Sequence, residues 1–100
     1  MYRHSVLFRF SPETTDEQIG QLTEGLSALP GQIPEILGYR IGPNVGERVD
    51  NWHYAIVADF ADVAAWRTYT DHPAHQAAIH AVVNPIVTDR AAVQYEVITP

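Results

Sequence analysis

The first ten residues alternate between two chemically different faces, and this period of two constrains the fold more than any other feature. Aromatic and β-branched residues at every second position are typical of a strand with one buried face. One face carries His4, Val6, Phe8 and Phe10, and the other carries Arg3, Ser5, Leu7 and Arg9. The chain is therefore predicted to open with a strand over residues 2–10, which Ser11 and Pro12 end.

A helical pattern follows over residues 14–29. Its start offers two overlapping capping boxes, in which a threonine is followed three residues later by Glu or Gln. These boxes are Thr14 with Glu17 and Thr15 with Gln18. An apolar stripe at helical spacing comes next, formed by Ile19, Leu22, Leu26 and Leu29. Pro30 and Gly31 then stop the helix.

A second helical region is predicted between Asp62, which suits a cap, and Pro85, which ends it. The pattern breaks near His72 and Pro73 and resumes to about Val83. Because proline is tolerated in the first turn of a helix but not in its middle, a new segment should start there. His72 is therefore expected at or near an N-cap.

Three further strands complete the pattern, over residues 36–45, 52–60 and 90–98. Residues 43–51 are rich in Pro, Asn, Gly and charge, which indicates a loop. The order β-α-β-β-α-β predicts an α+β fold, a ferredoxin-like sandwich with a four-stranded antiparallel sheet and two helices on one face. One hundred residues are too few for two cores, so residues 1–100 are expected to form a single domain.

The predicted sheet is apolar on both of its faces. In the third strand Trp52, Tyr54, Ile56, Ala58 and Phe60 oppose Ala55 and Val57. In the last strand Ala91, Val93, Tyr95 and Val97 oppose Ala92, Gln94 and Glu96. Two helices cover only one face, so the other face needs a cover, and a second copy packed sheet to sheet is the simplest. The alternative is a set of exposed valines that nothing covers.

Composition excludes several functional classes. The chain has no cysteine, which excludes a disulfide framework, a thiolate metal site and a cysteine nucleophile. Its formal charge is -6 and it has no basic cluster, which argues against nucleic acid and anionic membranes as partners. We find no transmembrane run and no signal-peptide pattern, and this favours a cytoplasmic location.

Histidines and a tyrosine supply the candidate chemistry. Tyr69, His72 and His75 follow one another at three-residue intervals, and His4 lies on the predicted inner face of the first strand. A neutral imidazole beside a phenol suits acid–base catalysis next to a carbonyl group. Two alternatives stay open. The histidines could bind a metal with Asp71 or Asp89, or they could be purely structural, as expected for His53 and His80.

The chain resembles the stress-responsive dimeric α/β-barrel (Dabb) domain family over nearly its whole length. The residues that carry this resemblance are the opening His4-Ser5-Val6-Leu7-Phe8-Arg9-Phe10 and the run Tyr69-Thr70-Asp71-His72-Pro73-Ala74-His75. The resemblance implies a ferredoxin-like protomer and a homodimer whose two sheets form a barrel. One branch of the family resembles plant polyketide cyclases related to olivetolic acid cyclase, which close a linear polyketide without a cofactor.

By motif position, the resemblance makes Tyr69 and His75 the catalytic pair, and no cofactor or metal is implied. His4, His72, Leu26, Ile56 and Gln94 would contact the substrate, a small molecule held between sheet and helices. Two departures matter. The cyclases have an aspartate where this chain has Gln94, which cannot stabilise an imidazolium by charge. The first helix carries Thr23, Leu26 and Ser27 in place of large aromatic residues, which implies a different ligand.

The predicted function is a cofactor-free lyase or cyclase acting on a carbonyl or polyketide-like compound. A non-catalytic stress-responsive or ligand-binding dimer is the first alternative. A cofactor-independent monooxygenase of the antibiotic-biosynthesis type, which shares the dimeric barrel, is the second.

Overall fold

The computed structural model describes residues 1–100 and confirms the predicted α+β class. The strands are β1 (Tyr2–Phe10), β2 (Gly38–Pro43), β3 (Tyr54–Phe60) and β4 (Val87–Glu96). The helices are α1 (Asp16–Ser27), α2 (Val63–Asp71) and α3 (Pro73–Ala78), with a 3-10 turn at Leu29–Gly31 and a π-helical turn at Ile79–Val83. The strands pair antiparallel in the order β2-β3-β1-β4. None of these helices combines the length and apolarity needed to cross a bilayer.

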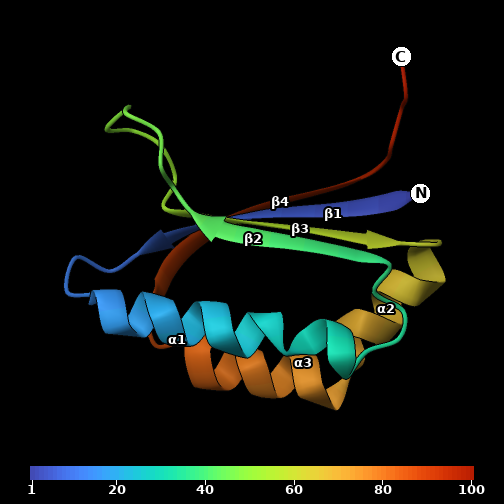
Figure 1. Ribbon diagram of the computed structural model, residues 1–100, viewed down its shortest axis with the longest axis horizontal. Helices are drawn as coiled ribbons and strands as arrows, with labels where there is room; N and C mark the ends of the chain where they lie inside the picture. The colour runs from blue at the N-terminus through green and yellow to red at the C-terminus, as the bar shows by residue number, and fades with distance from the viewer.

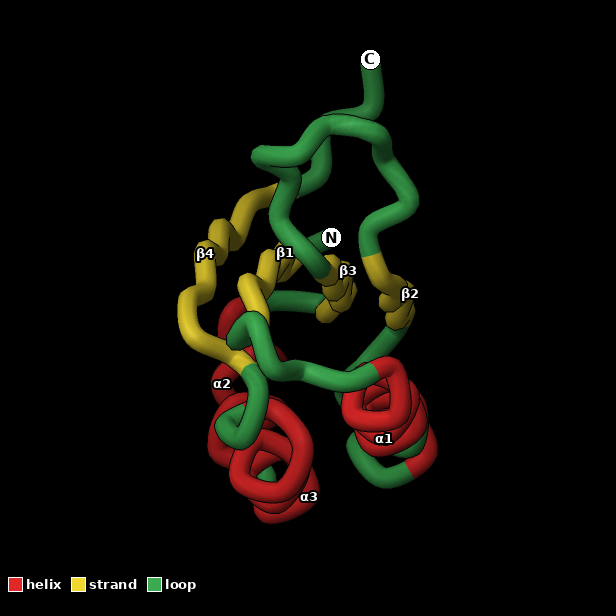
Figure 2. Tube along the Cα trace, turned by 90° about the vertical axis from the view of Figure 1, so that its left-hand side faces the viewer, coloured by secondary structure: helices red, strands yellow, loops and turns green.

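All helices lie on one side of the sheet (Figure 1). Seen from the end, α1 lies below β2 and β3, whereas α2 and α3 lie below β1 and β4 (Figure 2). On the opposite side, the β2–β3 loop and the C-terminal tail rise away from the sheet like two arms (Figure 1). The molecule therefore has a covered face, which contains the core, and an open face between the two arms.

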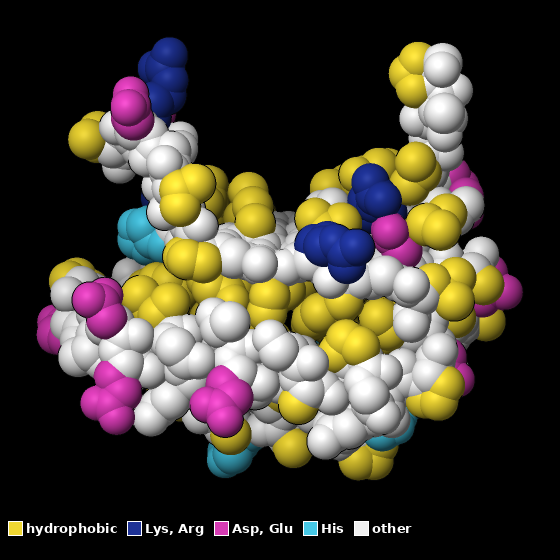
Figure 3. All heavy atoms as spheres, viewed as in Figure 1, with side chains coloured by type: hydrophobic (Ala, Val, Ile, Leu, Met, Phe, Trp, Pro, Cys, Tyr) yellow, Lys and Arg dark blue, Asp and Glu magenta, His cyan; other side chains and the backbone are white.

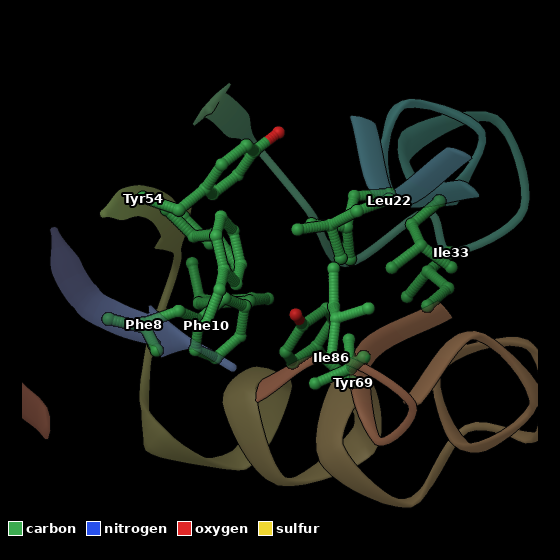
Figure 4. Packing of buried hydrophobic residues seen from close by; sticks show 14 residues of the cluster. Phe8, Phe10, Leu22, Ile33, Tyr54, Tyr69 and Ile86 are labelled. Carbon is green, nitrogen blue, oxygen red and sulfur yellow. The ribbon is translucent and has the colours of Figure 1, made fainter. Parts of the chain in front are cut away.

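The covered face is formed by the residues that the alternation predicts to share one face with His4. Fourteen buried hydrophobic residues form the core, and Phe8, Phe10 and Tyr54 from the sheet pack against Leu22 and Ile86 (Figure 4). Burial of this apolar surface supplies the main driving force for the two-layer arrangement.

Local signals place the helices, with one correction to the capping pattern. Of the two predicted boxes, Thr15 with Gln18 forms, and α1 begins at Asp16 rather than at residue 14. Asp62 caps α2, its carboxylate accepting the Ala65 backbone N–H at 2.9 Å. The break falls at His72, whose backbone is extended, and Pro73 occupies the first turn of α3 as predicted.

Three of the four strands have boundaries that differ from the prediction. β2 is shorter at both ends, spanning Gly38–Pro43 rather than residues 36–45. β3 begins at Tyr54 rather than at residue 52, because residues 51–53 leave the alternating pattern. Trp52 therefore lies under the Arg9 guanidinium, 4.2 Å from the ring centroid, instead of sharing the face of Tyr54. β4 differs at both ends from the predicted residues 90–98. It begins at Val87, before an irregularity in its pairing with β1, and ends at Glu96.

The open face of the sheet carries exposed apolar side chains. Cross-strand pairing brings Leu7 opposite Ala55 and Ala91, and the next pairs add Val57 and Val93. Leu7, Val93 and Tyr95 are all exposed. Figure 3 shows hydrophobic side chains gathered in the hollow between the two arms. A contiguous exposed apolar surface of this kind marks an interaction site rather than ordinary protein surface.

Candidate active site

A cavity of about 780 Å³ lies between the β1–β4 half of the sheet and the α2–α3 segment. Its floor is formed by inward side chains of the sheet, among them Val6, Phe8 and Ile56. The opposite wall comes from Tyr69, His75 and their neighbours on the helical segment. A cavity of this size, lined by hydrophobic and polar residues together, has the character of a small-molecule site.

Tyr69 and His75 are in direct contact at one wall of this cavity. Their ring centroids are 4.2 Å apart, with an interplanar angle of 41°. The break at His72 separates α2 from α3, so the two residues come from different helices and still meet. Tyr69 is 3% exposed and packs on Phe60 of the core, which fixes the position of its ring.

The His75 imidazole is oriented by the backbone. Its Nδ1 lies 3.1 Å from the Thr70 carbonyl oxygen, which is a hydrogen-bond acceptor only. The proton therefore resides on Nδ1 in the neutral ring, and Nε2 carries the lone pair. His75 is thus held in the tautomer that leaves the Nε2 lone pair available to a general base.

The hydrogen bond of His4 implies the opposite tautomer from that of His75. His4 is 6% exposed, and it is the only buried residue that does not belong to the hydrophobic core. The Gln94 side-chain Nε2 donates to His4 Nδ1 at 2.7 Å, from the directly paired position on β4. Because Nδ1 accepts, the ring proton of neutral His4 lies on Nε2, which makes Nε2–H a donor.

Burial sets the protonation states of these groups. It lowers the pKa of His4 from its usual 6.5 to about 4, with a smaller contribution from the Arg90 charge. Burial also lowers the pKa of His75, against the opposing effect of its hydrogen bond to the Thr70 carbonyl, so both imidazoles are neutral at pH 7. Burial raises the pKa of Tyr69, against the opposing effects of Tyr39 and Arg90, so the phenol keeps its proton.

Six of the seven residues proposed for the site come together in this cavity. They are His4, Leu26, Ile56, Tyr69, His75 and Gln94. His72 does not line it, because its Nδ1 accepts the Ala74 backbone N–H at 3.0 Å and caps α3. Thr23 and Ser27 do not line it either, and the Thr23 hydroxyl is hydrogen-bonded to the Tyr54 hydroxyl at 2.7 Å.

The remaining histidines lie away from the cavity. The His53 Nδ1 accepts the Phe10 backbone N–H at 2.9 Å, and its ring packs against that of Phe10. His80 is exposed. No three His, Asp or Glu side chains are grouped so that they could hold a metal ion, although Asp71 and Asp89 both line the cavity.

Several cavity residues were not predicted as site residues, and two of them bear on the chemistry of a ligand. Trp66 lines the cavity, and its ring lies 5.8 Å from that of His4. Arg90 is the second. It lies opposite Phe8 across the β1–β4 ladder, and this pairing places it on the covered face. The alternation of the last strand puts Arg90 on the same face as Ala92 and Gln94, which was the available signal.

Comparison with known proteins places the chain in a family. The model of the stress responsive A/B barrel domain matches residues 2–97. The chain belongs to this family. An uncharacterized protein of Streptomyces coelicolor is 32% identical to the Dabb chain over 81 residues, which cover 79% of this chain and 84% of the relative.

Solved structures support the same assignment. A dimeric ferredoxin-like protein of unknown function from Thermobifida fusca is 40% identical to this chain, with a TM-score of 0.88. The match covers 96% of this chain and 90% of the Thermobifida protein. A hydroxynitrile lyase from Passiflora edulis has a TM-score of 0.85 over 99% of this chain and 94% of its own. At 20% identity, the lyase shares the fold with this chain.

Proposed function

We propose that the protein is a cofactor-free acid–base catalyst, a lyase or cyclase, acting on a small carbonyl compound bound in the cavity. The observation that carries the proposal is the pair of ring hydrogen bonds at Nδ1, one to an acceptor in His75 and one from a donor in His4. From these bonds we infer a lone pair at His75 Nε2 and a proton at His4 Nε2. Together with the protonated phenol of Tyr69, the cavity holds one base and two hydrogen-bond donors.

In this proposal His75 removes a proton from the carbon next to the carbonyl group. The pair of electrons of that C–H bond moves into an enolate, and negative charge develops on the carbonyl oxygen. The Tyr69 O–H and His4 Nε2–H are the donors that stabilise this oxygen. His75 then returns its proton when the enolate attacks a second carbonyl or expels a leaving group, so the proton balance closes within the site.

The environment of His75 favours a neutral base. Its pKa is lowered by burial, so the lone pair is free at pH 7. No carboxylate is hydrogen-bonded to the His75 ring, whose partner is the Thr70 carbonyl oxygen. Gln94 is neutral and bonds His4, and the Glu96 carboxylate pairs with the N-terminal ammonium of Met1 at 3.1 Å. We therefore expect a base suited to acidic C–H groups, such as those between two carbonyls.

The proposed assembly is a homodimer joined through the open face of the sheet. The exposed apolar set around Leu7 and Val93 is the surface that a second copy would cover. The relative from Thermobifida fusca is described as dimeric at 40% identity. In such a dimer the cavities remain on the helical sides, because each lies on the covered face of its own sheet.

The proposal is tested by deuterium exchange at the carbon next to the carbonyl in a series of aryl diketones, followed by NMR in heavy water. The wild-type protein should accelerate exchange of at least one member of the series. His75→Asn should reduce this acceleration by about a hundredfold or more, and Tyr69→Phe should reduce it less. His80→Asn is the matched control, because His80 is exposed and outside the cavity.

Equal exchange by the wild type and His75→Asn would refute the catalytic role. Binding of the diketones without any acceleration would favour the alternative, a non-catalytic ligand-binding dimer. In that case the same variants should change affinity and leave the exchange rate at its uncatalysed value.

A further inference from the structure

One cavity residue has a charge that the proposed proton transfer does not use. Arg90 lies on the covered face of β4, opposite Phe8, and lines the cavity. Its guanidinium forms no ion pair and no hydrogen bond with the protein. The two ion pairs of the chain involve Met1 and Arg3, and the one hydrogen bond between Arg90 and a side chain is donated by its backbone N–H to the Asp89 carboxylate.

We propose that Arg90 binds the carboxylate of the substrate, so that the ligand is a keto acid whose carboxylate lies at the β4 side of the cavity. This inference rests on the proposed function for the position of the carbonyl group, near His75. The guanidinium fork matches the two oxygens of a carboxylate, and such pairs are stronger than neutral hydrogen bonds.

The charge of the cavity favours a monoanion. Arg90 is its only permanent cation, because the chain has no lysine and His4 and His75 are neutral at pH 7. Two carboxylates, Asp71 and Asp89, also line the cavity and would repel a ligand with further negative charge. A carboxylate therefore fits better than a phosphate, which carries up to two charges at pH 7.

The field of Arg90 reaches the reacting groups. Its positive charge contributes to the lowered pKa of His4 and of His75 and opposes the raised pKa of Tyr69. The guanidinium therefore shares one electrostatic environment with these three groups. A bound carboxylate would neutralise this charge, and burial, the larger cause of these pKa shifts, would still keep the base neutral and the phenol protonated.

The register of the sheet limits the length of the ligand. Arg90 pairs with Phe8 and Gln94 pairs with His4, four residues along β1. This separation is about 14 Å between backbone positions, since an antiparallel strand rises about 3.4 Å per residue. An arginine side chain takes up part of that length. The carbonyl and carboxylate of the ligand should therefore be separated by several carbon atoms.

The test is calorimetric binding of three keto acids of increasing length, each against its primary amide. Benzoylpropionate, benzoylbutyrate and benzoylvalerate share one aryl ketone and differ in the spacer. The wild type should bind at least one acid about tenfold or more tightly than its amide, the size expected for a charge-assisted pair. Arg90→Gln should remove this preference and leave the amide affinity unchanged, whereas Arg90→Lys should retain part of it.

Arg67→Gln is the matched control, because Arg67 is an exposed arginine on α2 outside the cavity. This variant should keep the full preference. The absence of a preference for any of the three acids in the wild type, or its persistence in Arg90→Gln, would overturn the inference. Tighter binding of phenylphosphonate than of the carboxylates would overturn the assignment to a monoanion.

These measurements use binding alone, so their outcome is separate from that of the exchange experiment. A lost preference in Arg90→Gln together with unchanged exchange in His75→Asn would retain the carboxylate site and reject the catalytic proposal. The reverse pair of results would retain catalysis and reject the carboxylate site.

Discussion

The buried imidazole of His4 should make the protein less stable in mild acid, by an amount that its environment sets. Folding lowers the pKa of His4 from 6.5 to about 4, mainly through burial. Between these two values the unfolded chain binds a proton that the folded chain excludes, so the free energy of unfolding falls as the pH falls. Below about pH 4 both states bind the proton, and this loss stops.

The full difference in pKa would correspond to about 3 kcal/mol. We expect about 2 kcal/mol, because His4 lies against a cavity that admits water, which screens the imidazolium. The pKa of His75 is lowered as well, so His75 adds to the loss of stability as the pH falls below the ordinary pKa of histidine. The wild type should therefore lose stability on acidification before most carboxylates titrate.

The assay is urea unfolding followed by circular dichroism at about pH 7.5 and about pH 4.5, at one protein concentration. The control is His4→Phe, which removes the titrating group and keeps a ring in its place. Carboxylates and His75 contribute equally to both proteins, so the difference between the two losses isolates His4. Equal losses in the wild type and His4→Phe would refute the reasoning.

Two further predictions concern stability and assembly. Gly20→Ala should raise the free energy of unfolding by about 0.5–1 kcal/mol through helix propensity, because nothing lies within 4 Å of the added methyl group. Gly25→Ala should gain less or lose stability, since the same methyl would lie 3.0 Å from the Val82 side chain; equal gains in urea unfolding would contradict this. Val93→Asp should weaken the proposed dimer about a hundredfold or more, because it places a charge in the interface. Light scattering would measure the dimer, and an unchanged dimer would mean that the interface lies elsewhere.

The fold was predictable because its signals are local and agree with one another. The alternation around Val6 and the capping signals at Thr15 and Asp62 each define one element, and their order leaves few arrangements. The ends of β3 and β4 were not predictable. Trp52 continues the alternating pattern in sequence, but hydrogen bonds of His53 to β1 hold the chain out of the strand.

The site was predictable only in part. Tyr69 and His75 followed from their spacing and the family resemblance, and their contact depends on a helix break that proline signals. His72 has the same spacing but caps α3, because the extended backbone at the break turns it away from the other two. Arg90 depends on the register of β4 against β1, which is a tertiary property that no short motif encodes.

The most direct measurement of the central claim is nitrogen-15 NMR of the imidazole rings at pH 7. The nitrogen chemical shifts identify the tautomer and the charge of each histidine without any ligand. The account predicts that His75 is neutral with its proton on Nδ1 and that His4 is neutral with its proton on Nε2. An imidazolium at His75, or a His75 proton on Nε2, would leave the cavity without its base and contradict the account.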